Sequence, residues 1–317
     1  MTTTLPTPAK PLKIGTRGSP LALAQAHETR ERLSAAFDLP PEAFEIVIIV
    51  TTGDRVQDRA LKDIGGKGLF TREIEEAMLS GGIDIAVHSM KDMPVLQPAR
   101  LIIDCYLPRE DVRDAFISIG GGDMEALAQG ATVGTSSLRR RSQLLYRRPD
   151  LHVVEFRGNV QTRLRKLSDG VAAATFLAMA GLRRLGRTGD IPHTPISVDA
   201  MLPAVAQGAI GIERRADDMR VAAMIEAIHD IPTGQRLAGE RAFLAALDGS
   251  CETPIASLAE LDGGSMRLRG EILRTDGSEC LADETSGAIE DAAEMGCALA
   301  AGLLVRAGEG FFDWHQA

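Results

Sequence analysis

GTSSLRRRSQLL, at residues 134–145, joins the end of a short apolar strand to the beginning of a helix. A glycine turn leads through Thr135, Ser136 and Ser137, and Ser137 precedes Leu138 as a helix N-cap would. Backbone N–H groups, hydroxyls and the positive end of the helix dipole then face one place. Three arginines in the first turns are unfavourable there unless a negative group joins them. The segment therefore predicts a site for a carboxylate or a phosphate, both of which suit the arginine fork.

The basic residues around this segment form an island in an acidic chain. The formal charge of the 317 residues is −9, yet residues 137–166 hold nine Lys/Arg against Asp150 and Glu155. The island thus carries +7 and the remainder −16. Such an island indicates a local anionic ligand, whereas the net charge opposes non-specific binding of nucleic acid. A solvated basic face of a helix is the alternative.

Short β-rich runs alternate with helical patterns on both sides of the segment, which predicts an α/β architecture. The expected strands are residues 12–16, 45–51, 84–88, 101–106, 115–119, 132–134, 152–156 and 172–177. The expected helices are residues 20–36, 71–79, 138–148, 160–167 and 179–185. Ser19 before Pro20 is expected to cap the first of them.

The pattern changes after about residue 230, where it becomes typical of a small α+β domain. A helix is expected at residues 232–247 and ends at a Gly-Ser-Cys turn. Alternating runs at 255–261, 267–273 and 279–282 predict a small sheet, and a helix at 288–306 would cover it.

The segment IDIAVHSMKDMP, at residues 83–94, is the clearest candidate for chemistry. A buried strand ends at His88, and the chain then presents Lys91 and Asp92 before Pro94. An aspartate beside a cation stays ionised and can stabilise a positive charge or move a proton. A plain polar turn is the alternative, and His88 by itself is more often a satisfied core histidine.

Three further segments carry weaker signals. Arg17 and Ser19 lie in a strand-to-helix turn, although an ordinary turn would look the same. The glycine-rich loop IGGKGLF holds Lys67 without the spacing of a phosphate-binding Walker motif, so we expect a lid rather than an ATP site. Cys251 follows Gly-Ser in an exposed-looking turn, and the spacing of the four cysteines fits neither zinc nor disulfides. A small buried filler is the alternative for this cysteine.

Neither a membrane span nor a secretory signal is apparent. No apolar run approaches the roughly 20 residues that cross a bilayer. The N-terminus, MTTTLPTPAKPLK, lacks the apolar core of a signal peptide. We therefore expect a cytoplasmic protein.

Taken together, these segments resemble the porphobilinogen deaminase (hydroxymethylbilane synthase) family over about residues 12–308. The most specific motifs, in the family's order, are TRGSPLALAQA, GGKGLF, DIAVHSMKD, VGTSSLRRR, RGNVQTRL, AGLRRLG, LPAVAQGAIGIE and GSCETPIA. The resemblance implies two α/β lobes like those of periplasmic binding proteins, with a double crossover, and a small α+β C-terminal domain. The expected boundaries are 11–107 with 208–228 for domain 1, 108–207 for domain 2 and 229–317 for domain 3.

The activity implied by the resemblance is that of a transferase in tetrapyrrole (haem) biosynthesis. Four porphobilinogen molecules are condensed head to tail onto a covalent dipyrromethane primer, with release of ammonia and then of hydroxymethylbilane. The cofactor is held through Cys251. The substrate is a small molecule, and the resemblance implies a monomer with no metal, nucleic acid, membrane or obligate protein partner.

Residue roles carry over motif by motif. Asp92, with its neighbour Lys91, matches the catalytic residues. The residues that match the family's cofactor site are Cys251, Arg139, Arg140, Ser137 and Lys91. The residues that match its substrate site are Arg17, Ser19, Arg157, Arg163, Arg184, Lys67 and Gln207. Two departures stand out: Asp63 replaces a second lid lysine of some relatives, and Ala173-Ala174 replaces a common Asp-Ala.

Two other classes of function are compatible with parts of the sequence. A two-lobed binding protein for a polycarboxylate anion would explain the arginines but neither Cys251 nor the Lys91-Asp92 pair. A nucleic-acid binder could use the basic island. Aromatic residues, on which nucleic-acid bases would stack, make up only 4% of the chain, however.

Overall fold

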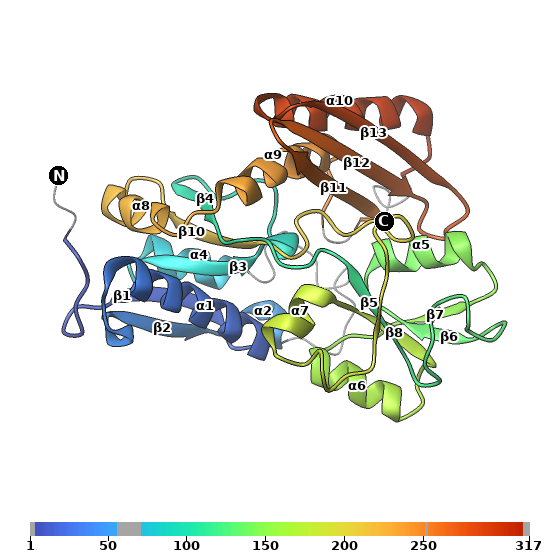
Figure 1. Cartoon of the computed structure of the whole chain (residues 1–317), viewed down its shortest axis with the longest axis horizontal. Helices are drawn as coiled ribbons and strands as arrows, with labels where there is room; N and C mark the ends of the chain where they lie inside the picture. Colours follow the sequence, from blue (N-terminus) through green and yellow to red (C-terminus); the bar gives the residue numbers. More distant parts are fainter. Residues whose placement is uncertain (1–3, 56–70, 251–252, 313–317) are drawn as a thin grey trace. The chain divides into compact units, whose positions relative to one another are not determined.

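The computed structural model describes residues 4–55, 71–250 and 253–312 (Figure 1). The chain divides into two compact units, Met1–Arg109 with Ala209–Gly234, and Glu110–Gly208 with Gln235–Ala317. The chain therefore leaves the first unit after Arg109 and returns at Ala209. It leaves again within helix α9 (Ile231–Ala246).

A five-stranded mixed sheet forms the centre of the first unit, in the order β2-β1-β3-β10-β4. Its strands are β1 (Leu12–Arg17), β2 (Phe44–Ile49), β3 (Ile85–Ser89), β4 (Leu101–Tyr106) and β10 (Ile210–Arg215). β1 is parallel to β2 and β3, whereas β10 is antiparallel to β3 and β4. Strand β10 is thus the first strand after the chain returns, and it inserts between β3 and β4, which precede it in the sequence.

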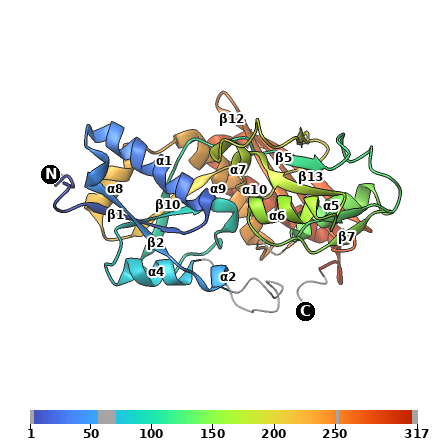
Figure 2. The ribbon, with the colours of Figure 1, turned by 90° about the horizontal axis from the view of Figure 1, so that it is seen from below.

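Helices cover both faces of this sheet (Figure 2). Helices α1 (Pro20–Phe37) and α8 (Met219–Glu226) pack with one face in a core that includes Ile14 and Ile212. Helix α4 (Arg72–Leu79) packs on the opposite face, in a core that includes Ala86. The remaining short helices are α2 (Thr52–Arg55), η1 (Pro41–Ala43) and η2 (Met90–Asp92).

The second unit contains a five-stranded sheet in the order β7-β6-β8-β5-β9. Its strands are β5 (Asp114–Ser118), β6 (Thr132–Gly134), β7 (His152–Val154), β8 (Ala174–Ala178) and β9 (Thr194–Pro195). β6 is parallel to β7 and β8, whereas β5 is antiparallel to β8 and β9. The order and directions are those of the first sheet, and β5 is again the first strand after a crossing.

Helices also cover both faces of the second sheet. Helices α6 (Val160–Ser168) and α7 (Met179–Arg184) share a core with Phe156. Helix α5 (Leu138–Arg147) lies on the other face, where Phe116 and Phe176 meet edge to face with ring centroids 5.4 Å apart.

The rest of the second unit is an antiparallel sheet in the order β11-β12-β13. Its elements are β11 (Ile255–Asp262), β12 (Ser265–Leu273), β13 (Cys280–Ala288), η3 (Ile289–Asp291) and α10 (Ala292–Ala307). Helix α10 packs along the sheet (Figure 1). Gly270 is required at its place because a Cβ there would lie 2.5 Å from the ring of Phe243 on α9.

The expected α/β lobes and the small α+β region are confirmed, as are both helix caps. The hydroxyl of Ser19 accepts from the Ala22 N–H at 3.3 Å, and that of Ser137 accepts from the Arg140 N–H at 3.4 Å. The strands β9 and β10 and the helix α8 were not predicted from the sequence, and neither were the short helices α2, η1 and η2. The strand expected at 279–282 is more than twice as long. The boundaries of the three expected domains stay a prediction.

Within the described part of the chain, every helix is too short or too polar to traverse a lipid bilayer.

Replacing Gly134 by alanine tests how tightly the second sheet is packed. A Cβ at this position would lie 2.4 Å from Cγ of the buried Phe156 ring. Because the interior is close-packed, we expect Gly134→Ala to lower the free energy of unfolding by about 1–3 kcal/mol, measured by denaturant titration.

Gly189→Ala is the matched control, because Gly189 lies in the same unit and nothing comes within 4 Å of an added Cβ. Its free energy of unfolding should change by less than about 0.5 kcal/mol. Equal effects of the two substitutions would contradict the packing described for Gly134.

Candidate functional site

The first unit has a small hollow of about 70 Å³ at the carboxyl end of β1 and β3. The β1–α1 turn contributes Arg17 and Ser19, and the end of β3 and the turn after it contribute Ser89 and Asp92. Its lining also includes Leu21, Ala22, Gln25, Thr71, Val87, His88 and Met93. Three predicted residues from two separate motifs, Arg17 and Ser19 from one and Asp92 from the other, therefore meet in one hollow. Open α/β sheets commonly bind ligands at this edge.

Asp92 is presented by a short turn that is anchored on both sides. The N–H of Met90 donates to the carbonyl of Ala209 at 3.0 Å, and the N–H of Met93 donates to that of Met90 at 3.2 Å. Both methionines are buried, whereas Lys91 and Asp92 between them are half-buried. The two buried methionines on either side fix the turn and hold the Asp92 carboxylate at the lining of the hollow, where it can act on a ligand.

Arg17 already holds an internal carboxylate. Its Nε–H donates to Oδ1 of Asp54 at 3.1 Å, and the hydroxyl of Thr51 donates to Oδ2 at 2.8 Å. Burial alone would raise the pKa of Asp54, but the Arg17 guanidinium and Thr51 lower it below its ordinary value. The predicted anion-binding arginine is therefore oriented by an aspartate that the sequence analysis did not identify.

His88 contributes to the lining of the hollow but is buried and has an internal partner, as its alternative interpretation proposed. Its Nε2 lies 3.0 Å from Oε2 of Glu213, and both side chains are buried. Ser89, the next residue, exchanges hydrogen bonds with Gln25 of α1 at 2.8 and 3.1 Å. These contacts fix the end of β3 and hence the turn that carries Asp92.

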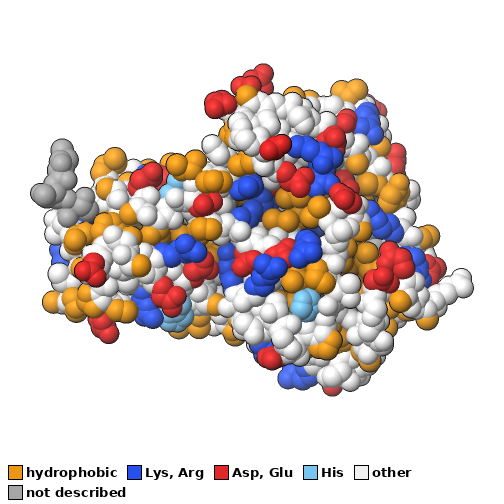
Figure 3. Space-filling model, in the orientation of Figure 1, with side chains coloured by type: hydrophobic (Ala, Val, Ile, Leu, Met, Phe, Trp, Pro, Cys, Tyr) orange, Lys and Arg blue, Asp and Glu red, His pale blue; other side chains and the backbone are white. Residues whose placement is uncertain are grey.

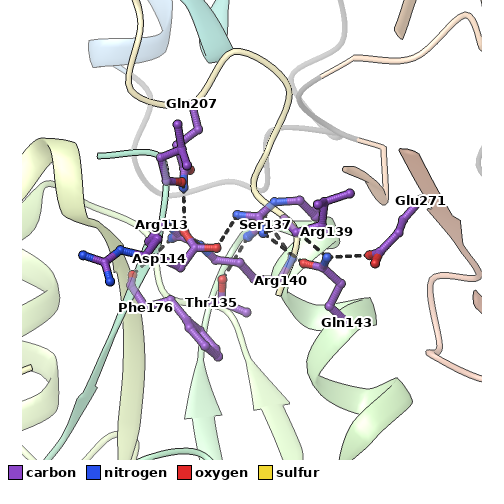
Figure 4. A network of polar contacts seen from close by, with 12 residues as sticks. Arg113, Asp114, Thr135, Ser137, Arg139, Arg140, Gln143, Phe176, Gln207 and Glu271 are labelled. Carbon is purple, nitrogen blue, oxygen red and sulfur yellow. Dashed lines mark hydrogen bonds and ion pairs between the residues drawn. The ribbon is translucent and has the colours of Figure 1, made fainter. Parts of the chain in front are cut away.

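In the second unit, Arg140 is held by a buried aspartate at the start of β5 (Figure 4). Its Nε–H and an Nη2–H donate to Oδ1 of Asp114 at 3.1 and 2.7 Å. An Nη1–H donates to the carbonyl of Phe176 at 3.2 Å. The hydroxyl of Ser137 caps the helix at the backbone of Arg140, so its own side chain is committed to the turn.

Arg139 is held differently. Its Nη1 donates to Oε1 of Gln143 at 2.9 Å and to the carbonyl of Leu202 at 3.0 Å. Its Nη2 lies 2.8 Å from Oδ2 of Asp114 as an ion pair, and Gln143 in turn donates to Glu271 at 2.8 Å. The two arginines are only 3% and 5% exposed. The negative group that the sequence predicted near this helix is thus supplied in part by the chain itself.

Gln207 completes the contacts of Asp114. Its Nε2 donates to Oδ1 of Asp114 at 3.0 Å and to the carbonyl of Val112 at 2.7 Å (Figure 4). Burial alone would raise the pKa of Asp114, but Arg139 and Arg140 hold it well below its ordinary value. Gln207 was predicted to contact substrate. In the structure it connects the chain just before its return to the first unit with Asp114, the partner of Arg139 and Arg140.

The other predicted arginines lie at the ends of α6 and α7. Asn159 caps α6 by accepting from the Thr162 N–H at 2.9 Å, and the Nε–H of Arg163 donates to the carbonyl of Gly158 at 2.9 Å. Arg157 precedes this turn and is half-buried. Arg184 ends α7, whose first residues are buried in the same core as α6.

Among the arginines predicted to bind cofactor or substrate, Arg139 and Arg157 each have a buried guanidinium nitrogen without a hydrogen-bond partner in the described residues, Nε and Nη1 respectively. Three other arginines of the described chain share this property at Nε, namely Arg30, Arg187 and Arg269. A buried N–H without a partner costs about 1–3 kcal/mol, so such atoms are suited to an incoming acceptor. The carboxylates of a pyrrole chain are acceptors of this kind. The residues present therefore fit a dipyrromethane.

Part of the basic island has a structural role. Arg148 pairs with Asp150 at 2.8 Å and donates to carbonyls in residues 124–127. Arg139 and Arg140 are buried. On the face shown in Figure 3, Lys and Arg side chains are interspersed with Asp and Glu. The burial of Arg139 and Arg140 and the pairing of Arg148 reduce the number of cations that the island could offer to nucleic acid, which favours continuous basic patches.

Lys67, Asp63 and Cys251 lie outside the described residues, so their predicted roles stay predictions. The structure adds three acidic residues that the sequence analysis missed, namely Asp54, Asp114 and Glu213. Each one contacts a basic or imidazole side chain that is distant in sequence. Asp54 and Asp114 lie outside the segments singled out in the sequence, whereas Glu213 ends the LPAVAQGAIGIE motif but was given no role.

Comparisons with known proteins agree with the motifs. The family described as "Porphobilinogen deaminase, dipyromethane cofactor binding domain" matches residues 12–223, and "Porphobilinogen deaminase, C-terminal domain" matches residues 235–305.

Curated relatives match nearly the whole chain. A porphobilinogen deaminase of Paracoccus denitrificans (strain Pd 1222) is 65% identical over 98% of this chain and 99% of its own length. A chloroplastic porphobilinogen deaminase of Pisum sativum is 53% identical over 95% of this chain and 83% of its own length. Among solved structures, the probable amino-acid ABC transporter extracellular-binding protein ytmK of Bacillus subtilis covers 68% of this chain and 89% of its own. At 12% identity and a TM-score of 0.40, it adds nothing to the assignment.

The contact between Arg17 and Asp54 predicts a pH-dependent contribution to stability. Asp54 has a folded-state pKa below its unfolded value, so its ionised form stabilises the fold above about pH 4. That contribution is lost as the pH falls through the folded-state pKa. We expect Asp54→Asn to lower the free energy of unfolding by about 1 kcal/mol at pH 7 and by progressively less below pH 4, measured by urea titration.

Glu42→Gln removes an exposed carboxylate from the same unit and serves as the control. An Asp54→Asn effect that stays constant from pH 7 to pH 3 would show that the charge of Asp54 does not contribute.

Proposed function

The chain belongs to the porphobilinogen deaminase family, and from this premise we propose how its own residues share the reaction. It is an enzyme of tetrapyrrole biosynthesis with a dipyrromethane cofactor. When bound, this cofactor supplies the pyrrole end onto which porphobilinogen is condensed. We assign the attachment of the cofactor to Cys251. Once four porphobilinogen molecules have been added, water releases the linear tetrapyrrole as hydroxymethylbilane.

Asp92 is the residue to which we assign stabilisation of the reacting pyrrole. Porphobilinogen becomes cationic as it loses ammonia, and a fixed carboxylate lowers the energy of that developing charge. The observation that carries this proposal is the anchored turn between buried Met90 and Met93, which holds Asp92 at the lining of a hollow. Lys91, its neighbour on the same turn, is assigned to the catalytic site together with Asp92.

The arginines of the second unit are assigned to the acetate and propionate groups of the pyrroles. Each added ring brings two further carboxylates, so the demand for cations rises as the product grows. Arg139 and Arg157 each have a buried N–H without a partner in the described chain and are suited to donate to these carboxylates. Arg140, Arg163 and Arg184 are assigned to the same carboxylates. Ser137 fixes the turn before α5 by capping the helix at the N–H of Arg140. Arg17, Ser19, Lys67 and Gln207 are assigned to substrate by family resemblance.

A binding protein without catalysis is not favoured. The family match includes both the cofactor-binding region and the C-terminal domain, and it spans the segment that contains Cys251. A receptor would need neither that cysteine nor the anchored Asp92.

Intact mass spectrometry tests the attachment of the cofactor. Protein supplied with porphobilinogen should carry an adduct of two pyrrole units, and Cys251→Ala should lack it. Cys297→Ala is the control, because Cys297 is an exposed free cysteine on α10 and should leave the adduct in place. An adduct that persists in Cys251→Ala would overturn the assignment.

Asp92→Asn tests the catalytic proposal. The substitution keeps the size of the side chain and removes its charge, so the fold and the adduct should be retained. Turnover of porphobilinogen should fall by about two to three orders of magnitude, as when one preorganised group is removed. Glu45→Gln, which removes an exposed carboxylate on β2, should leave turnover unchanged. Near-normal turnover of Asp92→Asn would remove Asp92 from the central role.

A further inference from the structure

Asp114 is a fully buried carboxylate with no role in the reaction as assigned above. It begins β5, and its side chain is 0% exposed. Four polar groups lie around it: Nε and Nη2 of Arg140, Nε2 of Gln207 and Nη2 of Arg139 (Figure 4). They come from α5 and from the chain that returns toward the first unit. A single carboxylate therefore contacts two arginines predicted to bind the cofactor and a glutamine predicted to bind substrate.

The local charge around Asp114 is incompletely balanced. Two guanidinium groups, 3% and 5% exposed, lie in direct contact with one carboxylate. Glu271 acts on Arg139 from farther away, with Gln143 between them. Burying a guanidinium without an adjacent counter-ion is costly, so the contact with Asp114 is needed as long as no ligand is present.

The two arginines use Asp114 unequally. Arg140 directs two nitrogens at Oδ1, within normal hydrogen-bond distance. Arg139 approaches Oδ2 to 2.8 Å, yet Oδ2 has no aligned hydrogen bond from any described residue, and neither does Nε of Arg139. The charge of Arg139 is thus balanced by Asp114, while its Nε–H stays available to donate to another acceptor.

We propose that Asp114 is a positioning residue for cofactor loading: it serves as the internal counter-ion of Arg139 and Arg140 until carboxylates of the dipyrromethane join them. This inference rests on the proposed function, in which these arginines bind the cofactor. It differs from a merely structural role because the need for Asp114 falls once the ligand supplies negative charge of its own.

The test compares thermal unfolding of protein made without porphobilinogen and of the same protein after incubation with it, with the adduct verified by intact mass. Asp114→Asn keeps the shape and removes the charge. The unloaded variant should unfold about 10 °C below the unloaded wild type, because a buried ion pair has lost one partner. In the loaded variant the deficit should be at most about half as large, because ligand carboxylates offset the missing charge.

Asp150→Asn is the matched control. It removes the carboxylate of the more exposed Arg148–Asp150 pair in the same unit, and the difference between loaded and unloaded protein should equal that of the wild type. An Asp114→Asn protein that loads normally and shows equal deficits in both states would overturn the inference. A wild type that acquires no adduct would instead refute the proposed function.

A double variant keeps the inference testable if Asp114→Asn does not fold. Asp114→Asn with Arg140→Gln replaces a charged pair by two neutral amides and removes the uncompensated guanidinium. In the unloaded state this protein should unfold at a higher temperature than Asp114→Asn alone, or be soluble where the single variant is not. A double variant that is no more stable than the single one would contradict the counter-ion role.

Discussion

The contact between one buried carboxylate and two buried guanidinium groups determines how the second lobe is arranged. Arg139 and Arg140 lie in the first turn of α5, where the helix dipole is positive and solvent is excluded. Asp114 beside them offsets the cost of burying two guanidinium groups. The first residue of β5, the start of α5 and the chain at Gln207 are therefore placed by one electrostatic requirement.

The first lobe follows the same rule on a smaller scale. Arg17 leaves the end of β1 beside the N-terminus of α1 and is held by Asp54. In both lobes an arginine near the beginning of a helix is oriented by an aspartate from another element. Holding the side chain in advance reduces the conformational entropy lost when a ligand binds, which suits the carboxylate-binding role proposed for these arginines.

The sequence predicted the elements that follow local rules and missed what depends on distant partners. Ser19 and Ser137 marked helix starts correctly because capping involves residues only three positions apart. Strand β10 was missed because Glu213 and Arg214 interrupt its apolar pattern, although both are buried by partners far along the chain. Asp114 was missed for the same reason: a lone aspartate before a strand looks like an ordinary turn residue until Arg140 is seen beside it.

The sheet orders have a consequence for how the chain matures on the ribosome. Strand β4 pairs only with β10 within the described sheet, and β10 follows the entire segment that builds the second five-stranded sheet. The amino-terminal lobe therefore cannot close its sheet until translation has passed Arg215. Until then it exposes the edges of β3 and β4, which makes this nascent stage the one most dependent on protection from aggregation.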